Sequence, residues 1–123
     1  MLIGGSNRDY SVAELRAHTV YSGGYWATDD YIAMFWSVIS DDFNARERSL
    51  LLRFVMSCSR PPLSGFGSLK PLFTICKVDD DVNRLPSAST CFNLLKLPQY
   101  ASRSILRSKL LMAIESGSGF EMS

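Results

Sequence analysis

The sequence predicts a small α+β domain, and three observations lead to this fold class. The 123 residues match the length of one domain. Apolar residues make up 46% and charged residues 20% of the chain, which is typical of a folded globular protein. Segments with the apolar spacing of helices fill the first half, and two short β-branched or aromatic segments follow before a last helix.

The first two helices are predicted from their N-caps and their apolar spacing. Ser11 can cap a helix over residues 12–19, with Glu14 as the reciprocal partner of a capping box. Thr28 or Asp29 can cap the second helix. Apolar residues recur in the second helix at i, i+3, i+4 and i+7, namely at Ile32, Phe35, Trp36 and Ile39.

The third helix and the last helix are predicted in the same way. Asn44 can cap the third helix, with Glu47 at its third position. The last helix begins near Ser102 and is expected to end at Gly117, which can adopt the left-handed C-cap conformation. The expected inward residues are Leu50, Leu51 and Phe54 in the third helix, and Ile105 or Leu106, Leu110, Ala113 and Ile114 in the last.

Two strands are predicted between these helices, over residues 73–76 and 91–97. A loop of small residues, Ser87 to Thr90, precedes the second strand, so Cys91 opens that strand. A thiol placed there can be both reachable and firmly held. Because the thiolate is the attacking species in covalent catalysis, this placement makes Cys91 a possible nucleophile.

The other two cysteines, Cys58 and Cys76, are expected to behave as small buried hydrophobes, as free cysteines usually do. By spacing alone the same would hold for Cys91. Only its neighbours favour reactivity, because Ser89 and Thr90 are too small to shield the sulfur and Phe92 can anchor the strand behind it.

Charge and composition exclude several classes of function. The net charge is +1 with acids and bases interspersed, which disfavours nucleic acid as a partner. The apolar runs are too short to cross a membrane, and no signal peptide is visible. Three widely spaced cysteines are typical of a reducing compartment, so we expect a cytoplasmic or nuclear protein. His18 is expected to be a partly exposed helical residue, and no metal or cofactor is predicted.

Several short motifs occur in order along nearly the whole chain. They are Gly23-Gly24-Tyr25, Phe35-Trp36, Ser59-Arg60-Pro61-Pro62-Leu63, the run from Arg84 through Cys91 to Asn93 with Leu97-Pro98-Gln99-Tyr100 after it, and Gly119-Phe120. Together they resemble the C-terminal lobe of HECT-type ubiquitin ligases. The sequence around Cys91 is most similar to that of the family branch whose members bear an IQ motif.

The resemblance implies a fold and a division of the chain. A HECT C-lobe-like fold is a small mixed sheet packed with helices, and residues 23–123 would form it. Residues 1–22 would be a short helical remnant of the family's N-terminal lobe together with the hinge. The hinge itself would lie at Gly23 and Gly24, where paired glycines accept unusual backbone angles.

The resemblance also implies an activity, that of a ubiquitin-protein transferase. A ubiquitin-conjugating enzyme would pass ubiquitin to Cys91 as a thioester, and a lysine of a substrate protein would then take it. Thr90 is the immediate neighbour of the acceptor thiol, and Asn93 follows in the strand. Phe120 matches a phenylalanine near the C-terminus that assists the transfer to lysine in the family.

Two departures from the family pattern bear on this activity. Many members carry histidine two residues before the cysteine, where this chain has Ser89. In the family a larger N-terminal lobe docks the conjugating enzyme, and the resemblance implies that these 123 residues hold only its remnant, so their activity alone is expected to be incomplete. The open interface predicts unpartnered apolar residues among Leu2, Ile3 and Leu15. The alternative is a non-catalytic module that binds ubiquitin or a conjugating enzyme as a decoy of full-length ligases, a role that would not require Cys91.

Overall fold

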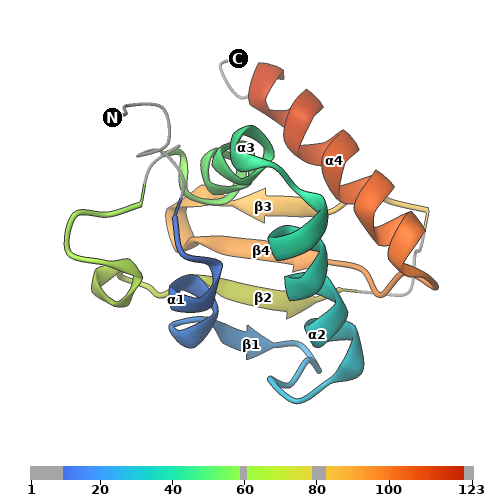
Figure 1. Ribbon diagram of the computed structural model, residues 1–123, viewed down its shortest axis with the longest axis horizontal. Helices are drawn as coiled ribbons and strands as arrows, with labels where there is room; N and C mark the ends of the chain where they lie inside the picture. The colour runs from blue at the N-terminus through green and yellow to red at the C-terminus, as the bar shows by residue number, and fades with distance from the viewer. Residues whose placement is uncertain (1–9, 59–60, 79–82, 121–123) are drawn as a thin grey trace.

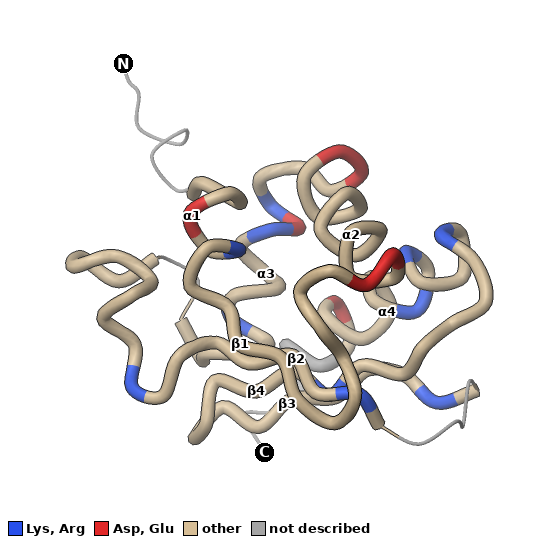
Figure 2. The backbone as a smooth tube through the Cα atoms, turned by 90° about the horizontal axis from the view of Figure 1, so that it is seen from below, with Lys and Arg blue, Asp and Glu red and all other residues tan. Residues whose placement is uncertain are grey.

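The computed structural model describes residues 10–58, 61–78 and 83–120. A four-stranded sheet lies at its centre, and α2, α3 and α4 lie over the sheet in Figure 1. In the perpendicular view of Figure 2 the helices lie on one side of the strands, so the architecture has two layers. The helical elements are α1 (Val12–Ala17), α2 (Asp30–Ser37), the π-helix η2 (Val38–Asp42), α3 (Ala45–Met56), the 3-10 turns η3 (Phe66–Ser68) and η4 (Thr90–Phe92), and α4 (Arg103–Phe120).

The sheet has the order β1-β2-β4-β3 and is mixed, which confirms the predicted fold class. Its strands are β1 (Val20–Ser22), β2 (Thr74–Lys77), β3 (Ser87–Ser89) and β4 (Leu94–Leu97). β1, β2 and β4 run parallel, whereas β3 pairs antiparallel with β4 as a hairpin. Ile75, Leu95 and Leu97 are buried and their strand neighbours are half-buried, because alternate side chains point to opposite faces of a strand. One face of the sheet therefore forms the core with the helices.

The helix starts follow the predicted caps with two exceptions. The capping box of Asn44 and Glu47 is complete in both directions at the start of α3. Ser11 caps α1 as predicted, but the Glu14 carboxylate accepts from the Phe66 backbone N–H instead of reciprocating. Asp29 is the N-cap of α2, yet its carboxylate accepts from the Trp26 N–H in the preceding loop.

The core contains most of the predicted inward residues. Ile32, Phe35, Trp36 and Ile39 are buried as expected, and so are Leu106, Leu110, Ala113 and Ile114 of α4. For α3 the predicted stripe was rotated by about one residue. Its buried residues are Leu51, Leu52 and Val55, whereas Leu50 and Phe54 are only half-buried.

Three expectations about element ends were wrong. α4 does not end at Gly117 but continues to Phe120. The second predicted strand begins at Leu94 and not at Cys91, because a 3-10 turn precedes it. The small residues before that turn form the strand β3 and not a loop.

Among the described residues, no helix combines the length and the apolar character that crossing a membrane would require.

The described residues before Gly23, residues 10–22, belong to the same packed body as those after it. Leu15 is buried at 1% exposure, so it is not one of the unpartnered apolar residues expected here, while Leu2 and Ile3 lie outside the described residues. β1 pairs with β2 through the register Val20↔Thr74. The division into residues 1–22 and 23–123, with a hinge at Gly23 and Gly24, stays a prediction about a longer protein.

Gly23 and Gly24 form the turn between β1 and the loop that leads to α2. Their φ angles are 71° and 117°, in the region that glycine enters without a steric cost. A Cβ on Gly23 would lie 2.5 Å from the Lys77 carbonyl oxygen. The glycine is therefore required for the close approach of this turn to the end of β2.

Candidate functional site

Cys91 lies in the turn that joins β3 to β4. The turn is a single 3-10 turn over Thr90–Phe92, and both Cys91 and Phe92 are exposed. The hairpin comes from the edge of the sheet, since β3 is the last strand in the order. The thiol is thus presented at the surface as predicted, although from a turn and not from the start of a strand.

Asn93 fastens this turn to the rest of the protein. Its φ of 51° and ψ of 44° place it in the left-handed region, which asparagine tolerates better than most residues. Its side-chain Nδ2 donates to the Pro71 carbonyl oxygen at 2.7 Å. Its own carbonyl oxygen accepts from the Thr74 N–H at 3.0 Å, at the start of β2. One residue therefore closes the turn and ties it to two neighbouring backbone groups.

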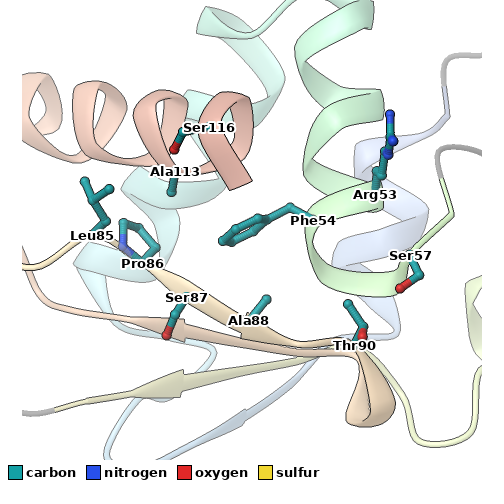
Figure 3. A pocket seen from close by; sticks show the side chains of 10 residues that line it. All are labelled: Arg53, Phe54, Ser57, Leu85, Pro86, Ser87, Ala88, Thr90, Ala113 and Ser116. Atoms are coloured by element: carbon teal, nitrogen blue, oxygen red, sulfur yellow. The ribbon is translucent and has the colours of Figure 1, made fainter. Parts of the chain in front are cut away.

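A pocket of about 400 Å³ lies beside the Cys91 turn, between α3, α4 and β3. Figure 3 shows Phe54 pointing from α3 into this space, with Thr90 at the end of β3 below Ser57. Leu85 to Ala88 form one wall of the pocket, and Ala113 and Ser116 of α4 close it. The pocket was not predicted. The signal that could have indicated it is Phe54, whose place next to the true inward stripe leaves it only half-buried.

The other two cysteines differ from Cys91 in their surroundings. Cys58 follows the C-terminal end of α3 and is exposed, so the expectation that it is buried was wrong. Cys76 is half-buried in β2, and its thiol donates to the Lys77 carbonyl oxygen at 3.4 Å. In the part of the chain that the structure describes, the Cys91 thiol makes no hydrogen bond or ion pair.

The remaining candidate residues lie elsewhere. His18 ends α1 as an exposed residue, with its Nδ1 3.1 Å from the Glu14 carbonyl oxygen. Phe120 is the last residue of α4, and its side chain lies outside the described part of the structure. Over the described ranges, His, Cys, Asp and Glu form no group of three that could hold a metal ion. Acidic positions there lie in the helical elements or at their starts, whereas basic positions also lie on strands and loops (Figure 2).

This geometry suits an exposed thiol that exchanges an acyl group. Cysteine is nucleophilic enough at neutral pH to attack an activated carbonyl without a dedicated base. The turn holds the attacking atom, and the adjoining pocket offers apolar and hydroxyl side chains to an incoming chain. The structure brings Thr90, Cys91 and Asn93 together in one turn and gives no position for the Phe120 side chain.

The family model and the relatives that match this chain point to the same protein family. A family model described as HECT-domain (ubiquitin-transferase) matches residues 1–123. The chain is 42% identical over 146 residues to human ubiquitin-protein ligase E3B, covering 99% of this chain and 14% of that protein. It is 45% identical over 123 residues to the E3 ubiquitin-protein ligase HUL5 of Saccharomyces cerevisiae, covering 100% of this chain and 13% of that protein.

A third relative is the human E3 ubiquitin-protein ligase HACE1, with 42% identity over 121 residues that cover 94% of this chain and 13% of the relative. The chain therefore spans about an eighth of the length of the curated relatives it matches. The finer placement, nearest to the branch with an IQ motif, stays a prediction.

Proposed function

Because the chain belongs to the HECT-domain (ubiquitin-transferase) family, we propose that it is part of a ubiquitin-protein ligase and carries ubiquitin as a thioester on Cys91. In this proposal a ubiquitin-conjugating enzyme supplies the ubiquitin, and a lysine of a substrate protein receives it. The observation that supports Cys91 most directly is its exposed place in a turn that Asn93 holds by hydrogen bonds.

The two proposed steps are exchanges at one carbonyl carbon. In the first, the Cys91 thiolate attacks the thioester of the loaded conjugating enzyme. A new C–S bond forms, the old one breaks, and the departing thiolate takes up the proton that Cys91 released. In the second, a deprotonated lysine amine attacks the Cys91 thioester, a C–N bond replaces the C–S bond, and the proton from nitrogen restores the Cys91 thiol.

Positioning is the main contribution that the protein can make to the first step. Exchange between two similar thiols is close to isoenergetic, so the protein need not supply driving force. The rate of this exchange then depends on how well the Cys91 sulfur and the carbonyl carbon of the thioester are aligned. The turn is short, and Asn93 closes it in the left-handed backbone conformation. This limits the motion of the sulfur and so favours a reactive geometry.

We propose that the C-terminal tail of ubiquitin lies along β3. In the described part of the chain β3 has a strand neighbour on one side only, and the open edge of a strand can pair with an extended peptide. The pocket beside this strand contains Phe54, Pro86 and Thr90, next to Cys91. A tail in this position would bring its terminal carbonyl carbon to the Cys91 sulfur.

Three further residues receive supporting roles in this proposal. Thr90 lines the pocket and would contact the tail next to its reactive end. Asn93 would hold the turn during both steps. Phe120, at the end of α4, would assist the step to lysine, as the resemblance implies. We also propose that the protein works in the cytoplasm or nucleus, because an exposed reactive thiol needs a reducing compartment.

Cys91→Ser tests whether the chain is a covalent carrier. We expect a ubiquitin adduct after incubation with activating enzyme, conjugating enzyme and ubiquitin. The same adduct should form with ubiquitin activated as a small-molecule thioester, which requires no docking lobe. Reducing agent should remove it, and Cys91→Ser should abolish it or make it resistant to thiols. Cys58→Ser changes the other exposed cysteine and should keep it. Ubiquitin binding without any adduct would contradict the proposal and favour the decoy module.

Phe120→Ala tests the second step separately. Because Phe120 is proposed to act after the thioester forms, charging of Cys91 should stay within about twofold of the parent rate, while transfer to a lysine peptide should fall about tenfold. Ile105→Ala, which changes an exposed apolar residue at the other end of α4, should affect neither rate. Equal losses in charging and transfer would rule out this role for Phe120.

A further inference from the structure

The hairpin that carries Cys91 has little in its own strands to fix its register. β3 is Ser87-Ala88-Ser89 and pairs with β4 through Ser87↔Lys96, Ala88↔Leu95 and Ser89↔Leu94. Register is normally specified by large side chains that must face the core, and a three-residue strand of small side chains offers few of them. The turn over Thr90–Phe92 sets the register at one end of the hairpin, so a second contact is needed to hold β3 along β4 at the other end.

Prolines also remove backbone bonds at the open end of this hairpin, opposite the Cys91 turn. Continuing the observed register places Pro86 opposite Leu97, and Leu85 opposite Pro98. Proline has no N–H, so neither Pro86 nor Pro98 can donate to a neighbouring strand. The ladder therefore loses donors on both strands just beyond the last observed pair.

The phenol of Tyr100 makes a bond across this open end. Its OH donates to the Arg84 carbonyl oxygen at 2.5 Å, linking the segment after β4 to the segment before β3. Tyr100 is itself held in place, because its backbone N–H donates to the Tyr31 OH at 3.0 Å. The Tyr31 OH in turn donates to the Pro98 carbonyl oxygen at 2.8 Å. Tyr31 and Tyr100 are both buried.

We propose that Tyr100 is a positioning residue for Cys91, because its bond to Arg84 fixes β3 along β4 and so fixes where the turn holds the sulfur. A slip of one residue along a strand moves the chain by about 3.3 Å. Displacements of about 1 Å at a reacting atom can cost as much as a hundredfold in rate. This inference rests on the proposed transfer of ubiquitin to Cys91.

Tyr25 provides a matched control for Tyr100. Its OH is also buried and also donates to a backbone carbonyl oxygen, that of Leu97, at 2.8 Å. This bond reaches the end of β4 only and makes no link to β3. Tyr25→Phe and Tyr100→Phe therefore remove the same kind of bond, but only Tyr100→Phe frees β3.

The experiment compares both variants of the full 123-residue chain in three measurements below their melting temperatures. For Tyr100→Phe we expect thioester formation from activated ubiquitin to slow about tenfold, against about twofold or less for Tyr25→Phe. Hydrogen exchange of the β3 amides should quicken in Tyr100→Phe alone. The rate at which iodoacetamide alkylates Cys91 should also change only in Tyr100→Phe. Thermal melting should show similar losses of stability for both variants.

Two results would overturn the inference. One is an equal slowing of ubiquitin transfer in both variants, which would mean that general destabilisation explains the effect. The other is β3 exchange and Cys91 alkylation that are the same in Tyr100→Phe as in the parent chain. Neither of these last two measurements uses ubiquitin. If the parent chain takes up no ubiquitin, the proposed function fails, and exchange and alkylation still decide whether Tyr100 positions the turn.

Discussion

Asn93 is the residue at which a backbone conformation and a side-chain bond act together on the Cys91 turn. Asn93→Ala removes the bond to Pro71 and puts a less tolerant residue at a φ of 51°. We expect the free energy of unfolding to fall by about 2 kcal/mol, half from the lost bond and half from the backbone. Asn93→Gly removes only the bond and should cost about 1 kcal/mol.

Urea denaturation of the two Asn93 variants measures this difference directly. If alanine and glycine destabilise the protein equally, the left-handed conformation contributes nothing, and only the side-chain bond matters. Both variants should also charge Cys91 more slowly than the parent chain, because each releases the turn from Pro71.

At the same scale, the sequence predicted the exposure of Cys91 correctly, but it did not predict the exposure of Cys58 or the pocket beside the Cys91 turn. The thiol stood beside small residues, and that local pattern was enough to predict exposure. Cys58 was expected to be buried, yet it is exposed and follows Ser57, whose φ of 63° ends α3. Phe54 and Thr90 line the pocket from separate elements, and no local pattern links two such positions.

At the scale of elements, helices were predicted more accurately than strands because their signals are local. The capping box of α3 lies within the residues from Asn44 to Glu47, and the structure has it as predicted. Glu14 of α1 had the same pattern, but Phe66 offers a competing N–H from a distant part of the chain. Tertiary contacts of this kind are invisible to a pattern of neighbouring residues.

The strands β1 and β3 were missed for a related reason. Each has only three residues, too few to show a clear alternation of apolar and polar side chains. β1 exists because Val20 and its neighbours pair with β2, which lies far along the chain. β3 exists because the chain turns back at Thr90–Phe92 and pairs with β4. Both strands come from pairing and not from propensity.

At the scale of the whole molecule, the main surprise concerns the first described residues. Leu15, which precedes the predicted hinge at Gly23 and Gly24, is buried in the same core as residues that follow these glycines. Tyr10, the first described residue, packs edge-on against Phe66 and donates to the Arg48 carbonyl oxygen at 3.1 Å. Gly23 and Gly24 thus form a tight turn in this structure. The described segment before them, residues 10–22, packs against several other parts of the fold.

The whole fold should also respond to high pH through its buried tyrosines. Tyr25 and Tyr31 stack with ring centroids 5.8 Å apart between β4 and the start of α2. Burial raises the pKa of both phenols above the ordinary value of 10, because the ionised form would lose its hydration. The folded state therefore keeps protons that the unfolded state releases.

The sign of the pH effect follows from these raised pKa values. The contribution of the neutral phenols to stability is fully present below the unfolded pKa of about 10, and it is lost as pH rises above it toward the folded values. We expect stability to fall above pH 10 by up to about 1.4 kcal/mol per pH unit for each phenol. Tyr25→Phe should lower stability at pH 8 but flatten this fall. Urea denaturation at several pH values across this range measures the free energy of unfolding. If that free energy falls equally steeply with pH in the parent and in Tyr25→Phe, the assignment to Tyr25 is contradicted.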